Sequence, residues 1–182
     1  MRILCNMLIK TGEKKGLLSD LNISLIRNKD WRIISKYSPS LDKSILHVEK
    51  AFEGSLYTDY SLFIQTFFNS LYDREFKSIL CGGLGLGVAP YLCQTFCDVV
   101  DVVEIDQDNI DLIKTAGYLS GKVNIICRNL LEYIPEKSYD VILLDIWQNT
   151  KGEYSTQKEI LKTNLTPYLN SNGLLCVPLE DY

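Results

Sequence analysis

A glycine-rich segment between an apolar strand and a helix constrains the fold of this 182-residue chain more than any other feature. Ser78 to Cys81 predicts a buried strand, and Val88 to Phe96 predicts a helix. Gly83, Gly85 and Gly87 lie between them with G-x-G-x-G spacing. Glycine adopts backbone angles that other residues avoid, and its missing Cβ lets a ligand approach the main chain. The pattern therefore predicts a ligand-binding turn.

Strand and helix patterns alternate regularly after residue 76. Continuous apolar runs predict further strands at 99–105, 123–127, 140–144 and 174–178. Asp106 is the expected N-cap of a helix that ends near Ala116, and a capping box at 156–159 is expected to open another helix. Because the strands are apolar throughout, helices should cover both faces of their sheet. The alternation predicts an α/β fold with a parallel, doubly wound sheet.

The first 75 residues have a different character and predict a small β/α segment. Short strands are expected at 22–26, 31–34 and 44–48, with a hairpin turn at 27–30. A helix is expected from Asp59, its N-cap, to Leu71. The apolar residues 1–10 are interpreted as a first strand rather than a signal peptide. We therefore expect two units, a small N-terminal segment at 1–75 and a doubly wound domain at 76–182.

An acidic residue ends the strand that follows the glycine loop. In nucleotide-binding folds of this kind, a carboxylate at the position of Glu104 accepts hydrogen bonds from both ribose hydroxyls. The alternative is a tight turn on a scaffold that binds no nucleoside. The G-x-G-x-G spacing, with Pro90 removing an early amide donor, disfavours the pyrophosphate cradle of dinucleotide folds. A nicotinamide-dependent oxidoreductase is therefore disfavoured.

Composition places the chain among soluble globular proteins. It is 46% hydrophobic and 23% charged with a net charge of −4, which excludes a disordered chain, and no apolar run is long enough to span a membrane. The first 50 residues hold ten Lys or Arg against five Asp or Glu. This basic excess could contact RNA, but without a tight cluster a solvated sheet face is favoured. We expect a cytoplasmic protein with neither a membrane nor a nucleic acid as partner.

Cysteine usage agrees with a reducing compartment. The six cysteines lie in apolar segments without a CxxC pair, and His47 is the single histidine. We therefore predict no metal site, reduced cysteines in the core, and a structural role for His47. The cysteines are Cys5, Cys81, Cys93, Cys97, Cys127 and Cys176.

Five segments carry a resemblance to a known family. They read KSILCGGLGLG, DVVDVVEID, NIICRNLLEYI, SYDVILLDIW and LTPYLNSNGLLCV, and span roughly Phe76 to Pro178. They resemble the class I S-adenosylmethionine-dependent methyltransferases, which are Rossmann-like, and within them most closely the spermidine synthase branch. The resemblance implies strand order 3-2-1-4-5 with the family's last two strands missing. The sheet edge would then be exposed, or covered by the N-terminal segment or a second subunit, and we expect a homodimer.

The resemblance also implies a set of site residues. Those implied for the cofactor are Gly83, Gly85, Gly87, Glu104, Ile105, Asn129, Leu130 and Asp145. Glu104 would bind the ribose, and Asn129 would contact the adenine amino group, although a turn-forming asparagine is an equal alternative. Asp145, the candidate catalytic residue, would orient the acceptor or take its proton, the alternative being an N-cap of the next loop.

Aromatic residues near this site are open to two interpretations. Trp147 could stack on a flat substrate or pack at the rim. Tyr57 and Tyr60 are expected to begin the helix that leads into the first strand of the sheet, a segment that helps to close the cofactor pocket in relatives.

The sequence also departs from the family. Cys81 stands where methyltransferases carry an acid, and Gly85 stands where spermidine synthases hold the amino-acid end of the cofactor with an aspartate. The second aspartate that follows the one at the fourth strand is missing after Asp145. These departures weigh against polyamine binding and aminopropyl transfer.

The leading hypothesis is therefore an S-adenosylmethionine-dependent transferase that methylates a small-molecule acceptor. The first alternative is a spermidine synthase-like aminopropyltransferase that uses decarboxylated S-adenosylmethionine. The second is a non-catalytic binding or scaffold protein that retains the fold.

Overall fold

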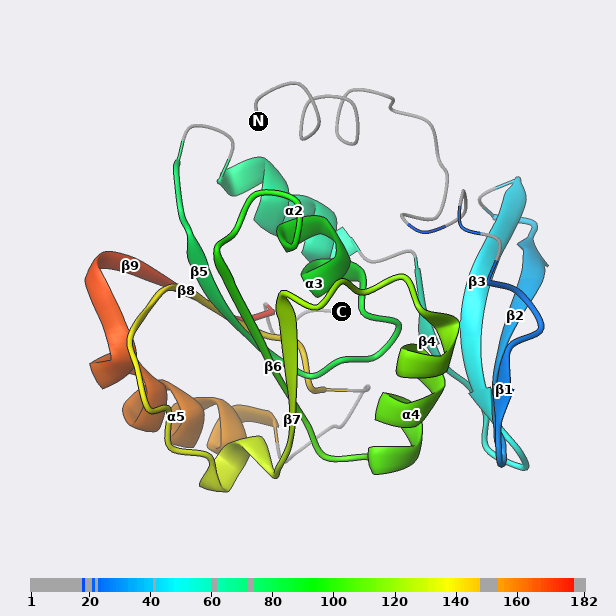
Figure 1. Ribbon diagram of the computed structural model, residues 1–182. Helices are drawn as coiled ribbons and strands as arrows, with labels where there is room; N and C mark the ends of the chain where they lie inside the picture. Colours follow the sequence, from blue (N-terminus) through cyan, green and yellow to red (C-terminus); the bar gives the residue numbers. More distant parts are fainter. Residues whose placement is uncertain are drawn as a thin grey trace.

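Two β-sheets organise the chain (Figure 1). The computed structural model describes residues 18, 21, 23–40, 42–59, 62–71, 74–147 and 154–178. The antiparallel sheet has the order β1-β2-β3-β4, with β1 Arg27–Asn28, β2 Trp31–Ser38, β3 Lys43–Lys50 and β4 Gly54–Thr58. The parallel sheet has the order β7-β6-β5-β8-β9, with β5 Ser78–Gly82, β6 Val99–Glu104, β7 Val123–Cys127, β8 Tyr139–Leu144 and β9 Leu169–Cys176. Counted from β5, this is 3-2-1-4-5, so the predicted fold class is confirmed.

Helices cover both faces of the parallel sheet, as its apolar strands predict. The helices are α2 Leu62–Ser70, α3 Val88–Cys93, α4 Gln107–Ala116 and α5 Tyr154–Leu165, with 3-10 turns η1 Leu130–Glu132 and η2 Thr166–Tyr168. The helices α2, α3 and α4 pack on one face, and α5 with η1 packs on the other. In Figure 1, α4 lies between the two sheets. No helix in the described ranges is long and apolar enough to cross a membrane.

Strand β5 shows why the strands of the parallel sheet read as continuous apolar runs. Ile79 and Cys81 point into the core that also contains the inner face of the antiparallel sheet, whereas Leu80 points into the core under α5. All three side chains are at most 1% exposed. Burying a side chain such as Ile79 stabilises the fold by about 1.5–3 kcal/mol, so both faces of the strand must be apolar.

One carboxylate is buried within this sheet. Asp101 on β6 is 3% exposed and accepts hydrogen bonds from Tyr139 Oη at 2.6 Å and Asn124 Nδ2 at 3.0 Å. Lys137 Nζ lies 2.9 Å from the same carboxylate. Burial alone would raise the pKa of Asp101, but these three partners together hold the pKa below its ordinary value.

The cap that the sequence predicts for α4 is present. The Asp106 carboxylate accepts hydrogen bonds from the backbone N–H groups of Asp108 and Asn109 at 2.9 and 3.2 Å. Gly117 ends the helix with φ 73°.

The helix start predicted from the capping box at 156–159 is wrong. Helix α5 already includes Tyr154, so the capping box at 156–159 lies inside it, and Glu159 pairs with Lys162 instead. Helix α2 begins at Leu62. Asp59, its predicted N-cap, accepts hydrogen bonds from the backbone N–H groups of Leu18 and Leu46, and because residues 60 and 61 lie outside the described residues, its capping role stays a prediction.

The N-terminal sheet differs most from its prediction. The strand expected at 22–26 is absent from the described residues 23–26, where Leu25 has a left-handed φ of 76°. The hairpin turn is shorter than predicted and consists of Lys29 and Asp30. Strand β4 was not predicted at all. The strand predicted at 1–10 lies outside the described residues.

Candidate functional site

A cleft of about 710 Å³ lies at the carboxyl ends of the parallel strands. Its volume falls within the range of roughly 300–1,000 Å³ that is common for small-molecule sites. The cleft is lined by seven of the eight residues that the sequence implies for the cofactor, namely Gly83, Gly85, Glu104, Ile105, Asn129, Leu130 and Asp145. Gly87 is not among the lining residues, and its backbone N–H closes the loop by donating to Leu84 O at 2.6 Å.

Gly83 holds the loop between the ends of two strands. Its N–H donates to Val103 O at 2.8 Å, and its φ of +90° is one that side chains rarely adopt. A Cβ at this position would lie 2.4 Å from the backbone oxygen of Asp145. The glycine is therefore required by the close approach of β5 to the residue that follows β8.

Gly85 faces the antiparallel sheet. Its φ is +50°, and a Cβ there would lie 3.4 Å from Cδ1 of Tyr57 on β4. Its carbonyl accepts a hydrogen bond from Asn109 Nδ2 at 3.2 Å. The loop position at which the spermidine synthase pattern has an aspartate therefore lies against the ring of Tyr57. Tyr57 itself lines the cleft, whereas Tyr60 lies outside the described residues.

Glu104 ties the glycine loop to the end of β6. Its carboxylate is buried and accepts hydrogen bonds from three backbone N–H groups, those of Leu84 at 3.0 Å, Ile105 at 2.8 Å and Asp106 at 2.9 Å. A carboxylate offers about four acceptor positions, so about one remains for a ligand hydroxyl. Bonding to both ribose hydroxyls, as the sequence suggests, would require one of these backbone bonds to be exchanged.

The far end of the cleft is apolar with a polar rim. Ile105 is 66% exposed within it, which leaves a large apolar surface for a flat ligand. Asn129 caps η1 by accepting from Leu131 N at 3.1 Å, so its turn-forming role is present, and its predicted adenine contact stays a prediction. Arg128 also lines this end, although sequence reasoning did not select it.

Asp145 stands at the opposite end of the cleft, directly after β8. Its backbone N–H donates to Gly82 O at 2.8 Å, and its side chain is open to solvent within the cleft. No described residue donates a hydrogen bond to its carboxylate or forms an ion pair with it. Desolvation by the surrounding protein raises the pKa of this carboxyl to about 6. Asp145 is therefore a carboxylate at neutral pH that can still bind a proton.

Trp147 lies beside Asp145 in the cleft wall. Its Nε1 donates to Gln157 Oε1 at 2.9 Å, and its ring packs edge-on against Tyr154 with centroids 4.7 Å apart. Rim packing is therefore present, and the ring also lines the cleft.

Several lining residues were missed by sequence reasoning. They include Leu56, Thr58, Ile64, Arg128, Leu131, Ile146 and Gln157. Arg128 carried a usable signal, because it follows a predicted strand of the sheet and precedes a predicted site residue. Residues 56 and 58 carried none, because their strand was not predicted.

The remaining sequence candidates lie away from the ligand space or beneath it. Cys81 is 1% exposed, and burial raises the pKa of its thiol, as expected of a small core residue. Cys93 and Cys97 are also buried, but Cys127 is exposed, so the prediction that every cysteine lies in the core is wrong. His47 lies on the antiparallel sheet, where its Nδ1 is 3.0 Å from Ser55 Oγ. No group of three metal-ligating side chains occurs within the described ranges.

Comparisons with known proteins identify the fold. No protein-family model matches the chain, and no curated protein matches it. Among solved structures, it is similar to N-methyltransferase NodS from Bradyrhizobium japonicum WM9 in complex with S-adenosyl-L-homocysteine, with TM-score 0.52, 16% identity, and coverage of 62% of this chain and 57% of that chain.

Two further solved structures give the same result. One is an S-adenosylmethionine-dependent methyltransferase from Clostridium acetobutylicum ATCC 824, with TM-score 0.51, 13% identity, and coverage of 62% and 47% of the two chains. The other is Haemonchus contortus phosphoethanolamine N-methyltransferase 1 with phosphoethanolamine and S-adenosylhomocysteine, with TM-score 0.52, 16% identity, and coverage of 62% and 24%.

The chain spans less than two thirds of the length of each of these proteins. At such identities the similarity establishes a shared fold. The protein has the Rossmann-like fold of methyltransferases. The closer resemblance to spermidine synthases stays a prediction.

Proposed function

We propose that the protein is an S-adenosylmethionine-dependent methyltransferase that acts on a small-molecule acceptor. The observation that carries the proposal is the placement of Glu104 and Asp145 in one cleft on either side of the glycine loop. The similarity of the fold to methyltransferases solved with S-adenosylhomocysteine supports it.

The lining residues fit the parts of the cofactor. Glu104 has about one acceptor position left for a ribose hydroxyl, and Ile105 offers an apolar surface to the adenine. Gly83 and Gly85 line the cleft and bring main chain without side chains to the place where the amino-acid end would lie. When bound, S-adenosylmethionine supplies an electrophilic methyl group on a sulfonium.

Asp145 is the residue that would act on the acceptor. Methyl transfer needs positioning more than acid–base chemistry, because the leaving group is neutral. With a pKa near 6, its carboxylate orients an acceptor N–H or O–H at neutral pH and takes up the proton that the acceptor releases. Trp147, fixed by Gln157, walls the same end of the cleft.

Isothermal titration with four ligands tests the cofactor assignment. The ligands are S-adenosylmethionine, its decarboxylated form, S-adenosylhomocysteine and NAD. We expect micromolar binding of the first and third and none of NAD. Glu104→Gln should weaken binding at least about tenfold, or about 1.4 kcal/mol. The matched control is Glu136→Gln, an exposed glutamate on the loop before β8, which should leave binding unchanged.

Turnover separates a binding protein from an enzyme. With an acceptor found by screening, Asp145→Asn should lower the rate about 100-fold while cofactor affinity changes little. Full turnover by Asp145→Asn would remove this residue from the mechanism. Preference for the decarboxylated ligand would favour aminopropyl transfer, and silence from all four ligands would contradict the proposed function.

A further inference from the structure

The antiparallel sheet forms one wall of the cleft. Leu56, Tyr57 and Thr58 of β4 all line it. The ring of Tyr57 faces Gly85, and the ring of Trp31 is stacked parallel to it with an interplanar angle of 2° and centroids 6.4 Å apart. Because Trp31 is only 3% exposed, Tyr57 is backed by a fixed core residue. The glycine loop therefore has an aromatic support that comes from outside the parallel sheet.

A β-bulge determines which way Tyr57 points. Val48 of β3 pairs with Tyr57, but the next residue, Glu49, pairs with Ser55, so Leu56 is left over. In a regular strand, residues two apart lie on the same face. The extra residue places Ser55 on the outer face with Glu49, and Tyr57 on the inner face with Trp31. Bulges of this kind re-aim side chains next to functional sites.

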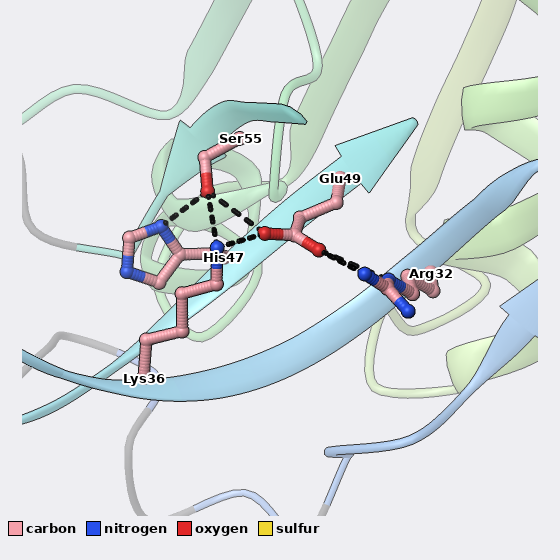
Figure 2. A network of polar contacts seen from close by, with 5 residues as sticks. All are labelled: Arg32, Lys36, His47, Glu49 and Ser55. Carbon is pink, nitrogen blue, oxygen red and sulfur yellow. Dashed lines mark hydrogen bonds and ion pairs between the residues drawn. The ribbon is translucent and has the colours of Figure 1, made fainter. Parts of the chain in front are cut away.

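A buried carboxylate is bound to the strand beside this bulge (Figure 2). Glu49 is 5% exposed, and its Oε2 accepts from Arg32 Nε at 2.9 Å and Nη2 at 2.7 Å. Its Oε1 pairs with Lys36 and accepts from Ser55 Oγ at 3.1 Å. Lys36 Nζ and His47 Nδ1 also lie 3.3 and 3.0 Å from Ser55 Oγ. Glu49 thus joins β2, β3 and β4 on one face.

We infer that Glu49 is a positioning residue for the cleft, holding the bulge through Ser55 so that Tyr57 stays against the glycine loop. Strand β4 is a five-residue edge strand, and within the described sheet it pairs with β3 alone. If the bulge moved so that Val48 paired with Leu56, Tyr57 would lose its place opposite Val48 on the inner face and would turn away from Gly85. The bond from Ser55 to Glu49 holds one side of the bulge, and the pairing of Val48 with Tyr57 holds the other side, with Leu56 between them.

The polar network around Glu49 is better explained by positioning of the bulge than by a contribution to the stability of the sheet. Removing a carboxylate from water is costly, and apolar packing at the same place would stabilise the sheet as well or better. Lys36 lowers the pKa of Glu49 to about 2 against the opposing effect of burial, with further help from Arg32 and Ser55. The Glu49 carboxylate therefore stays charged, and it holds the side chains of Arg32, Lys36 and Ser55 pointing toward it.

Hydrogen exchange of the protein without ligand tests the inference independently of the cofactor. Glu49→Ala and Tyr57→Ala should each accelerate exchange of the amides at 83–87 about tenfold, while the strand at 123–127 exchanges as before. Glu49→Gln, which keeps an oxygen for Ser55, should recover part of the protection. The control is Glu53→Gln, an exposed glutamate of the same hairpin that pairs with Lys50. The inference would be overturned if Glu49→Ala left exchange at 83–87 unchanged, or if it accelerated exchange equally at 83–87 and at 123–127.

Ligand affinity provides a second readout, which rests on the proposed function. Tyr57→Ala should weaken S-adenosylhomocysteine binding about tenfold, and Glu49→Ala about fivefold. Because Glu49 acts through Tyr57, the double variant should bind like Tyr57→Ala alone. Fully additive losses would contradict the inference. If the unsubstituted protein did not bind this ligand, the proposed function would fail, and the exchange experiment would still decide the role of Glu49.

Discussion

The two sheets use buried charge in different ways. In the parallel sheet, Asp101 on β6 lies among strands that are apolar on both faces, and it bonds to Asn124 on the adjacent β7 and to Tyr139 on β8 rather than to residues that line the cleft. In the antiparallel sheet, Glu49 lies beside the bulge that directs Tyr57 toward the cleft. The parallel sheet supplies the groups that would bind a ligand, and the antiparallel sheet supplies the cleft wall, in which the direction of the Tyr57 side chain matters. Functional geometry therefore depends on both.

Two left-handed glycines, one in each region, give the largest expected difference. Gly83 and Gly54 have φ of +90° and +80°, but a Cβ at Gly83 meets a backbone oxygen at 2.4 Å, whereas one at Gly54 meets nothing within 4 Å. Gly54→Ala should cost about 1 kcal/mol of unfolding free energy, the strain of the angle alone. Gly83→Ala should cost about 3 kcal/mol or more and abolish ligand binding. Urea unfolding measures both.

Equal losses in the two glycine variants would mean that the loop relaxes away from β8. The close approach of Gly83 to Asp145 would then not constrain the cleft.

Acid should weaken the antiparallel sheet through Glu49. Its folded pKa is about 2, below the ordinary 4.5, so its stabilisation is complete above pH 4.5 and is lost as pH falls toward 2. Arg32 and Lys36 are about half exposed, so solvent screens these pairs, and we expect about 1 kcal/mol. Unfolding free energy measured from pH 5 to 2 should fall less steeply in Glu49→Gln than in the unsubstituted protein. Parallel curves would remove Glu49 from the acid response.

The smallest effect is expected at Asp145, with the opposite sign. Its folded pKa is about 6, above the ordinary 3.8, so the folded state loses stability as pH rises from about 4 to 6. Asp145→Asn should therefore be more stable than the unsubstituted protein at pH 8, by less than about 1 kcal/mol because the side chain is open to solvent. The two proteins should melt alike at pH 4. A stability gap that did not change with pH would contradict the raised pKa.

Local signals made the parallel sheet predictable from sequence. Its strands are continuous apolar runs, Asp106 caps α4 through its own neighbours, and the glycine loop is confined to one stretch of chain. The location of the cleft could be predicted from the sequence for a similar reason. The carboxyl ends of parallel strands must meet at one edge, so the sequence could bring Glu104 and Asp145 together without knowing any distance.

The antiparallel sheet could not be predicted in this way. Strand β4 follows an exposed Phe52 with φ of 67°, and its place beside β3 depends on a bulge and on Glu49, neither of which has a local sequence signal. The capping box at 156–159 failed for a related reason. Its spacing is correct for a helix start, but Tyr154 already belongs to α5, so the same residues occur within the helix. Tertiary context decided both cases.

The stack of Trp31 on Tyr57 also gives the protein an optical property. The chain contains two tryptophans, Trp31 and Trp147. Trp147 lines the cleft at the end of β8, and Trp31 lies behind the ring that lines it from β4. Indole emission depends on its surroundings, and Trp147 borders the cleft directly whereas Trp31 is separated from it by the ring of Tyr57. Changes at either wall of the cleft would therefore be visible in the intrinsic fluorescence of the unlabelled protein.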